Sequence, residues 1–111
     1  MKKVAILAAE NSVLSTIASP MDMFLQAGVL WNVTMGKRPS PLFDVKIVTA
    51  DGEPVRAINN IPVIPSCSMY EIEDVDVIIL PSQGFLFNPQ DKGHIDRIEW
   101  LKVWYLPLIH I

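Results

Sequence analysis

The sequence predicts an α/β fold built on a doubly wound, mostly parallel sheet with a small edge hairpin. Apolar runs at 4–9 and 75–80, and a segment at 43–50 that alternates at first and then turns apolar, have the length and composition of strands. Apolar residues at helical spacing follow the first and the third of these segments. Near-continuous apolar runs are typical of strands that are covered on both faces. Buried strands that are separated by helices imply crossover connections, so the strands run parallel and helices cover the sheet.

The first strand, 4–9 (VAILAA), is followed by a helix that we expect to begin at Pro20. Ser19 can serve as the N-cap, and proline suits the first helical position. Apolar residues then recur on one helical face at Met21, Phe24, Leu25 and Gly28.

The middle of the chain predicts a second strand, a hairpin, a helical turn and a third strand. Asn59-Asn60 is typical of a two-residue hairpin turn between two short apolar segments. A single helical turn is expected at 68–72. The run VDVIIL at 75–80 predicts a buried central strand, which ends abruptly in Pro-Ser-Gln-Gly.

The last third of the chain predicts a helix and then the start of a further strand. Asn88-Pro89-Gln90-Asp91 resembles a helix cap, and an apolar face follows it, formed by Ile95, Ile98, Leu101 and Tyr105. The segment 106–111 (LPLIHI) reads as the beginning of a strand. We therefore expect residues 1–111 to be a single domain that is truncated to its N-terminal part.

Charge and composition exclude several classes of partner. The 111 residues carry a net charge of −3, with a pI near 5.2, and no cluster of Lys and Arg exceeds two residues. A nucleic-acid surface needs a basic stripe, so this part of the chain is not expected to bind DNA by itself. The first apolar run is too short to span a membrane. Because Cys67 is the single cysteine, it cannot form an internal disulfide, which fits the cytoplasm.

Polar residues follow the first and third strands, where ligands bind in open α/β sheets. Glu10 could act as an acid or base, polar neighbours could bind a ligand, and backbone N–H groups of the second loop could receive an anion. Loop solvation and a simple strand exit remain open as alternatives. The candidate residues in the two loops are Glu10, Asn11, Ser12, Ser82, Gln83 and Gly84.

No catalytic residue, metal site or cofactor is predicted. Cys67 has no histidine near it in the sequence, and His94, expected to face solvent, and His110 are too isolated to suggest metal binding. A Gly-rich phosphate loop is absent after the first strand. The apolar residues at 85–87 could line a pocket or a dimer contact, although packing beneath the next helix is the expected arrangement.

The chain resembles the ThiJ/PfpI superfamily, which is related in fold to class I glutamine amidotransferases. The stretches that carry the resemblance are 4–28, 43–84 with its order "strand, DG, hairpin, short helix, VDVIILP", and the helix before IHI at 109–111. The likeness is strongest to the N-terminal domain of AraC-type transcriptional regulators and covers about the first half of such a domain. It implies a flavodoxin-like or Rossmann-like sheet.

The resemblance also implies where catalysis would occur. In enzymes of the family, a nucleophilic cysteine follows the next central strand, a position that Cys67 does not occupy. An acidic residue that contacts this cysteine corresponds to Thr16, and the frequent Pro-Gly-Gly corresponds to Pro81-Ser82-Gln83-Gly84. These departures favour a binding pocket that includes Thr16 over a catalytic one.

Besides a structural or dimerisation half-domain that binds no ligand, two functions therefore remain in view. The first is the ligand-sensing domain of a dimeric AraC-type regulator, which binds a small polar metabolite and contacts DNA through a separate domain. The second is a ThiJ/PfpI-type cysteine hydrolase, amidase or isonitrile hydratase whose nucleophile lies beyond Ile111.

Overall fold

A parallel four-stranded sheet forms the centre of the molecule. The computed structural model describes residues 1–86 and 88–109. Strand β1 (Lys2–Leu7) pairs with β2 (Phe43–Thr49) on one side and with β6 (Val77–Ile79) on the other, and β2 also pairs with β5 (Cys67–Ser68). The order β5-β2-β1-β6, with every pair parallel, confirms the predicted fold class.

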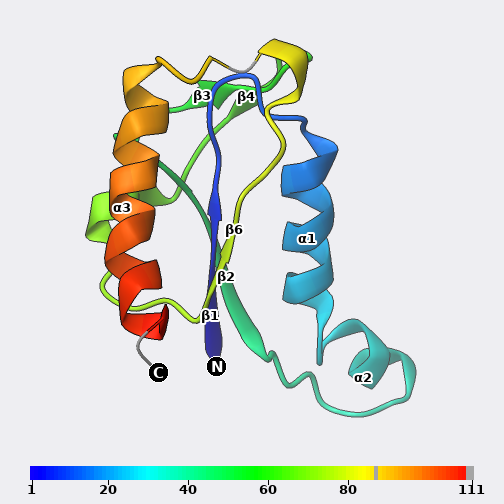
Figure 1. Cartoon of the computed structure of the whole chain (residues 1–111). Helices are drawn as coiled ribbons and strands as arrows, with labels where there is room; N and C mark the ends of the chain where they lie inside the picture. Colours follow the sequence, from blue (N-terminus) through cyan, green and yellow to red (C-terminus); the bar gives the residue numbers. More distant parts are fainter. Residues whose placement is uncertain (87, 110–111) are drawn as a thin grey trace.

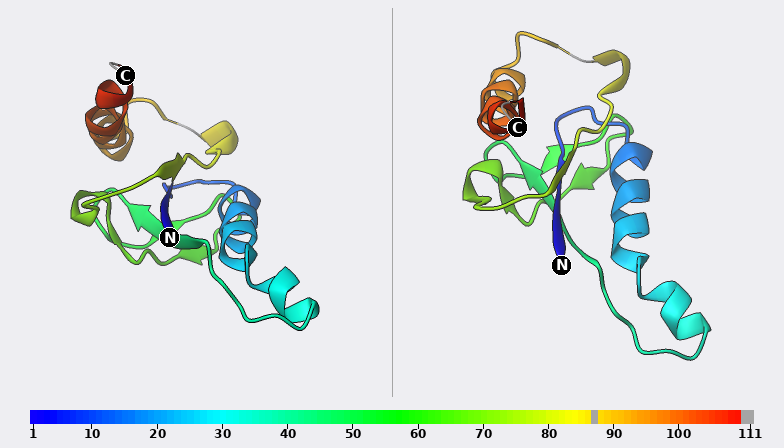
Figure 2. Two further views of the ribbon diagram at one scale, coloured as in Figure 1. Left: turned by 90° about the horizontal axis from the view of Figure 1, so that it is seen from below. Right: turned by 60° about the horizontal axis from the view of Figure 1, so that its bottom comes forward.

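Helices cover both faces of this sheet, as Figures 1 and 2 show. Helix α3 (Lys92–Ile109) lies on one face and α1 (Ser15–Gln26) on the other. The short helix α2 (Leu30–Thr34) projects from the end of α1. The described residues also include the 3-10 turns η1 (Met69–Glu71) and η2 (Gly84–Leu86).

The alternation of side chains along β1 divides the core in two. Ala5 and Leu7 point to the α3 side, where they cluster with Trp100. Ile6 and Ala8 point to the other side and cluster with Ile17 of α1. Because every side chain from 4 to 9 is buried, β1 is a strand covered on both faces, as its apolar run predicts.

The predicted start of the first helix is wrong by more than one turn. Helix α1 begins at Ser15, and Pro20 lies inside it. Ile17, in the first helical turn, is 2% exposed and packs against the sheet, so tertiary burial favours the early start. The apolar face also differs, since Leu25 is exposed and Gly28 falls beyond the helix with a positive φ of 76°.

The hairpin is confirmed, but its turn is one residue longer than expected. Strands β3 (Val55–Arg56) and β4 (Pro62–Val63) pair antiparallel as a separate two-stranded sheet. The amide of Ala57 donates to the carbonyl of Ile61, which encloses three residues. Asn60 has a φ of 67°, the left-handed conformation that a three-residue loop requires at its last position.

Helix α3 differs from the prediction in length and in orientation. The predicted strand at 106–111 is wrong for residues 106–109, which continue α3, while 110–111 lie outside the described residues. A short apolar run cannot be assigned to strand or helix by its pattern alone. The face toward the sheet carries Arg97 and Trp100, and the predicted Leu101 also packs against the core. Ile95 and Ile98 are exposed, and the side chain of Tyr105 lies outside the described part of the chain.

Strand β6 is not central among the described residues. It pairs with β1 and forms the edge of the sheet, and Val77 is exposed. Its apolar sequence suits a strand with neighbours on both sides, so the pattern predicts more burial than this edge position provides.

Truncation of Ile6 tests the central role of β1. Ile6 is 0% exposed, so Ile6→Ala should lower the free energy of unfolding by about 2–5 kcal/mol through lost burial and a residual cavity. The matched control is Ile64→Ala, because Ile64 is 74% exposed. Urea unfolding followed by circular dichroism measures both, and equal losses would contradict the assignment of the core.

Candidate ligand-binding site

The loops that follow β1 and β6 are joined at the carboxyl edge of the sheet (Figure 1). The amide of Val13 donates to the carbonyl of Ser82 at 2.6 Å, and the amide of Ser82 donates to Oγ1 of Thr16 at 3.1 Å. The Thr16 hydroxyl in turn donates to the carbonyl of Val13 at 2.6 Å. This closed set of hydrogen bonds fixes the turn after β6 to the first turn of α1.

Gln83 makes a second connection between the loops. Its Nε2 donates to the carbonyl of Glu10 at 3.2 Å, and its Oε1 accepts from Arg97 of α3 at 3.5 Å. Gly84 has a φ of 64°, and a Cβ there would approach Ile58 Cδ1 at 2.9 Å. The turn therefore requires glycine for its backbone and for its contact with the hairpin.

The hairpin supports the loop after β1. The amide of Asn11 donates to the carbonyl of Arg56 at 2.8 Å, and the amide of Arg56 donates to the Glu10 carboxylate at 3.3 Å. The amide of Ile58 donates to the carbonyl of Ser12 at 2.9 Å. Three segments that are distant in sequence thus form one edge of the molecule.

The predicted site residues come together there, but they differ in accessibility. The Ser12 hydroxyl is buried, donates to the carbonyl of Ala9 and accepts from its amide. The Ser12 and Thr16 hydroxyls therefore hold the backbone in place. The predicted residues that remain exposed or half-buried along the edge are Glu10, Asn11, Ser82, Gln83 and Gly84.

Two clefts flank the start of α3 at this edge. The first, of about 180 Å³, lies on the β6 side and is lined by Leu80, Gln83, Arg97 and Leu101, among others. The second, of about 570 Å³, lies on the β2 side and has a more polar lining that includes Glu10. Both clefts open next to the predicted loops, so the arrangement can admit small ligands.

Arg97 was missed by the sequence interpretation. It is 8% exposed and lines the smaller cleft. Desolvation by burial lowers the pKa of its guanidinium, and the charges of Asp91 and Asp96 oppose this shift. The sequence does indicate that Arg97 faces the sheet, because it precedes Trp100 by three residues and therefore shares the helical face of that large apolar side chain.

The other candidates lie apart from the loops or differ from expectation. Cys67, in β5, lines a different cleft together with Lys3 and Asp44, so it is not part of this edge. His94 is half-buried and lines the smaller cleft, which corrects its expected position in solvent. Phe85 is 86% exposed, so it does not pack beneath α3, while Phe87 lies outside the described residues.

Neither a candidate metal cluster nor a membrane-spanning helix occurs among the described residues. Across residues 1–86 and 88–109, no group of three His, Cys, Asp or Glu side chains could hold a metal ion. No helix in that part of the chain is both long and apolar enough to cross a membrane.

Solved structures resemble this arrangement along nearly the whole chain. A proposed transcriptional regulator from Vibrio parahaemolyticus is 19% identical, with a TM-score of 0.66 over 96% of this chain and 52% of its own. An AraC family transcriptional regulator from Pseudomonas putida is 17% identical, with a TM-score of 0.65 over 95% of this chain and 60% of its own. A DJ-1 superfamily protein from Agrobacterium tumefaciens is 19% identical, with a TM-score of 0.52 over 88% of this chain and 50% of its own.

These similarities show the class of fold. The chain has an α/β fold like that of the DJ-1 superfamily protein and of the AraC family transcriptional regulator. It spans between half and three fifths of the length of the three solved structures. No family profile matches the sequence, and no curated protein matches it either.

Substitution of Thr16 tests the connection between the loops. Thr16→Val removes the acceptor for the Ser82 amide and the donor to the Val13 carbonyl, so stability should fall by about 1 kcal/mol. The amide of Ser82 should exchange faster with solvent hydrogen. Thr16→Ser keeps the hydroxyl and should preserve the protection of this amide. Unchanged exchange in Thr16→Val would contradict the role of the hydroxyl.

Proposed function

We propose that this chain is the ligand-sensing part of an AraC-type transcriptional regulator. A small polar metabolite would bind at the carboxyl edge of the sheet, and its binding would change the affinity of a separate domain for DNA. We place the protein in the cytoplasm, where such a regulator acts on DNA.

The observation that carries the proposal is the contrast between the loops and the clefts beside them. The Thr16 hydroxyl accepts the Ser82 amide, which would otherwise be a backbone donor for a reacting oxyanion. The loops are therefore held by their own side chains, while clefts of about 180 and 570 Å³ stay open on either side of α3. A rigid edge with open clefts suits binding better than catalysis. The fold similarity to two regulators agrees with this interpretation.

Operator binding by the full-length protein tests sensing. Operator DNA is first selected from random sequences, and its affinity is then measured with a panel of small polar metabolites. We expect at least one metabolite to change operator affinity. If none does, sensing is wrong. Amidase or hydratase activity that depends on a cysteine after Ile111 would instead support the enzyme.

Two glycine variants locate the response. Gly84→Ala places a Cβ against Ile58 at the rim of the site, so it should weaken the response to the metabolite. Gly36→Ala is the control, because Gly36 also has a positive φ, of 71°, but a Cβ there meets nothing within 4 Å. Equal responses from the two variants would place the ligand elsewhere.

We also propose that the chain forms a dimer through the edge of β6 that has no partner strand among residues 1–86 and 88–109. An unpaired edge exposes backbone N–H and C=O groups that can pair with the same strand of a second copy. Val77 of this strand is an exposed apolar side chain that a second copy could cover.

A lysine at the β6 edge tests this interface. Val77→Lys should convert the dimer into a monomer, because a lysine on an edge strand disfavours pairing. Val33→Lys on α2 introduces the same charge at another exposed valine and should leave the dimer intact. Light scattering coupled to gel filtration measures the mass, and a monomeric unmodified chain would refute the dimer.

A further inference from the structure

Arg97 carries a charge into the interior at a cost in stability. Arg97 is 8% exposed and lies on the same face of α3 as the buried Trp100. A buried cation is unfavourable unless a carboxylate or several hydrogen-bond acceptors compensate it. Burial lowers the pKa of this guanidinium, which means that its charged form is less favourable in the folded than in the unfolded chain.

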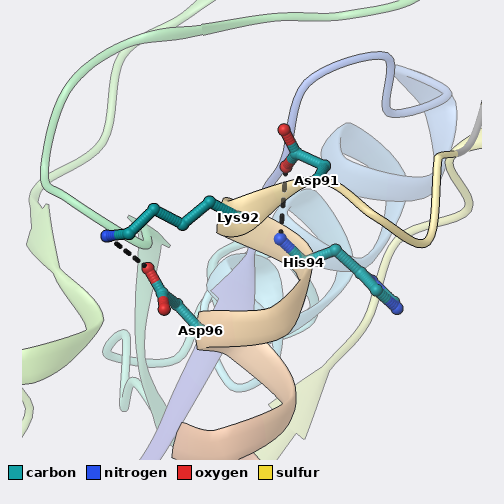
Figure 3. Close-up of polar contacts among 4 residues, drawn as sticks. All are labelled: Asp91, Lys92, His94 and Asp96. Atoms are coloured by element: carbon teal, nitrogen blue, oxygen red, sulfur yellow. Dashed lines mark hydrogen bonds and ion pairs between the residues drawn. The ribbon is translucent and has the colours of Figure 1, made fainter.

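The nearby carboxylates are engaged with other groups. Asp91 accepts the backbone amide of His94 at 3.2 Å, and Asp96 pairs with Lys92 at 3.4 Å, as Figure 3 shows. The charges of both aspartates act on Arg97 from a distance. Among the side chains that the structure describes, no carboxylate lies within ion-pair distance of the guanidinium.

Gln83 holds the guanidinium at the cleft. Its Oε1 accepts a hydrogen bond from Nη2 of Arg97 at 3.5 Å, and its Nε2 donates to the carbonyl of Glu10. A guanidinium has five N–H donors, so most of them remain after this one bond. Gln83, in the predicted site loop after β6, thus orients the Arg97 guanidinium, which retains N–H donors for a ligand.

The cleft beside Arg97 has an apolar wall. Leu80, Ile98 and Leu101 line it together with Gln83, and the His94 side chain, which points away from Asp91 in Figure 3, lines it as well. Its volume is about 180 Å³, enough for a small molecule only. One fixed cation next to aliphatic side chains matches a ligand with one anionic group and a short apolar remainder.

We propose that this cleft binds a small aliphatic monocarboxylate, with Arg97 pairing with its carboxylate group. The planar guanidinium matches a carboxylate in a two-pronged geometry. The side chains of Leu80, Ile98 and Leu101 then contact the aliphatic part. This inference rests on the proposed sensing function and names the ligand class for the smaller cleft.

The surrounding charge selects against phosphate and dicarboxylates. Asp91 and Asp96 lie close enough to act on Arg97, and the chain carries a net charge of −3. A second negative charge on the ligand would meet this field without a lysine or a second arginine in the cleft lining. The single negative charge of a monocarboxylate would instead offset the buried positive charge of Arg97.

The test uses the full-length protein and three probes: sodium butyrate, neutral butyramide of nearly the same shape, and inorganic phosphate. Butyrate should raise the melting temperature and shift the NMR signal of the Arg97 Nε–H group. Butyramide and phosphate should do neither. Butyramide binding as strong as butyrate binding, or phosphate binding more strongly, would overturn the proposal.

The variant Arg97→Met provides a second, independent test of the carboxylate site. Because it removes a buried charge that lacks an ion pair, the variant should be at least as stable as the unmodified protein without ligand. Its affinity for butyrate should fall roughly ten- to hundredfold, the range expected for loss of a charged hydrogen-bonded pair. The control is Arg38→Gln, since Arg38 is exposed in the loop after α2. Unchanged affinity in Arg97→Met would refute the role of Arg97. If that variant fails to fold, the NMR titration of the unmodified protein still decides.

The outcomes separate this proposal from the sensing function. If butyrate binds through Arg97 but operator affinity does not change, the cleft is a carboxylate site and sensing fails. If operator affinity responds to a neutral or cationic metabolite and Arg97→Met keeps that response, sensing stands and the carboxylate proposal fails.

Discussion

Burial of β1 on both faces is the constraint on which the rest of the structure depends. Its backbone pairs with β2 and β6, and its alternating side chains contact the clusters beneath α3 and α1. A strand with no solvated face has one acceptable register, because a shift by one residue would exchange the two clusters. The position at which β1 ends is therefore fixed, and with it the loop that begins at Glu10.

The site inherits its geometry from that strand end. Loops that follow neighbouring parallel strands meet at one edge, and here Thr16 and Gln83 join them. An acidic side chain in place of Thr16 would add a charge that needs a partner. A hydroxyl instead accepts the Ser82 amide and donates to the Val13 carbonyl, so it holds the turn without charge. Loops in this position could take part in catalysis or in ligand binding. Because uncharged side chains and backbone groups of the loops bond to one another, the arrangement favours ligand binding.

Features encoded by local composition could be predicted from the sequence, whereas features set by tertiary packing could not. The apolar runs identified β1, β2 and β6, and the loops after β1 and β6 do meet. The predicted helix start at Pro20 is wrong because the preference for Ser19 as N-cap is worth only about 1 kcal/mol. Burial of the Ile17 side chain, which requires the earlier start, stabilises the fold by more than that. The strand predicted from the apolar run is wrong for residues 106–109, because such a short apolar pattern suits either helix or strand. The edge position of β6 among the described residues depends on which strands lie beside it, and composition does not reveal them.

The orientation of α3 explains why a charge lies beside the predicted loops. Trp100 is 7% exposed in the core cluster with Ala5 and Leu7, and burial of so large a side chain sets the rotation of the helix. Arg97, one turn earlier, must then face the same way, while Ile98 turns outward. A methionine at position 97 would fill this place without the cost of a buried charge. A guanidinium that tryptophan packing forces inward, and that Gln83 holds at a cleft, is better explained by a bound anion than by stability.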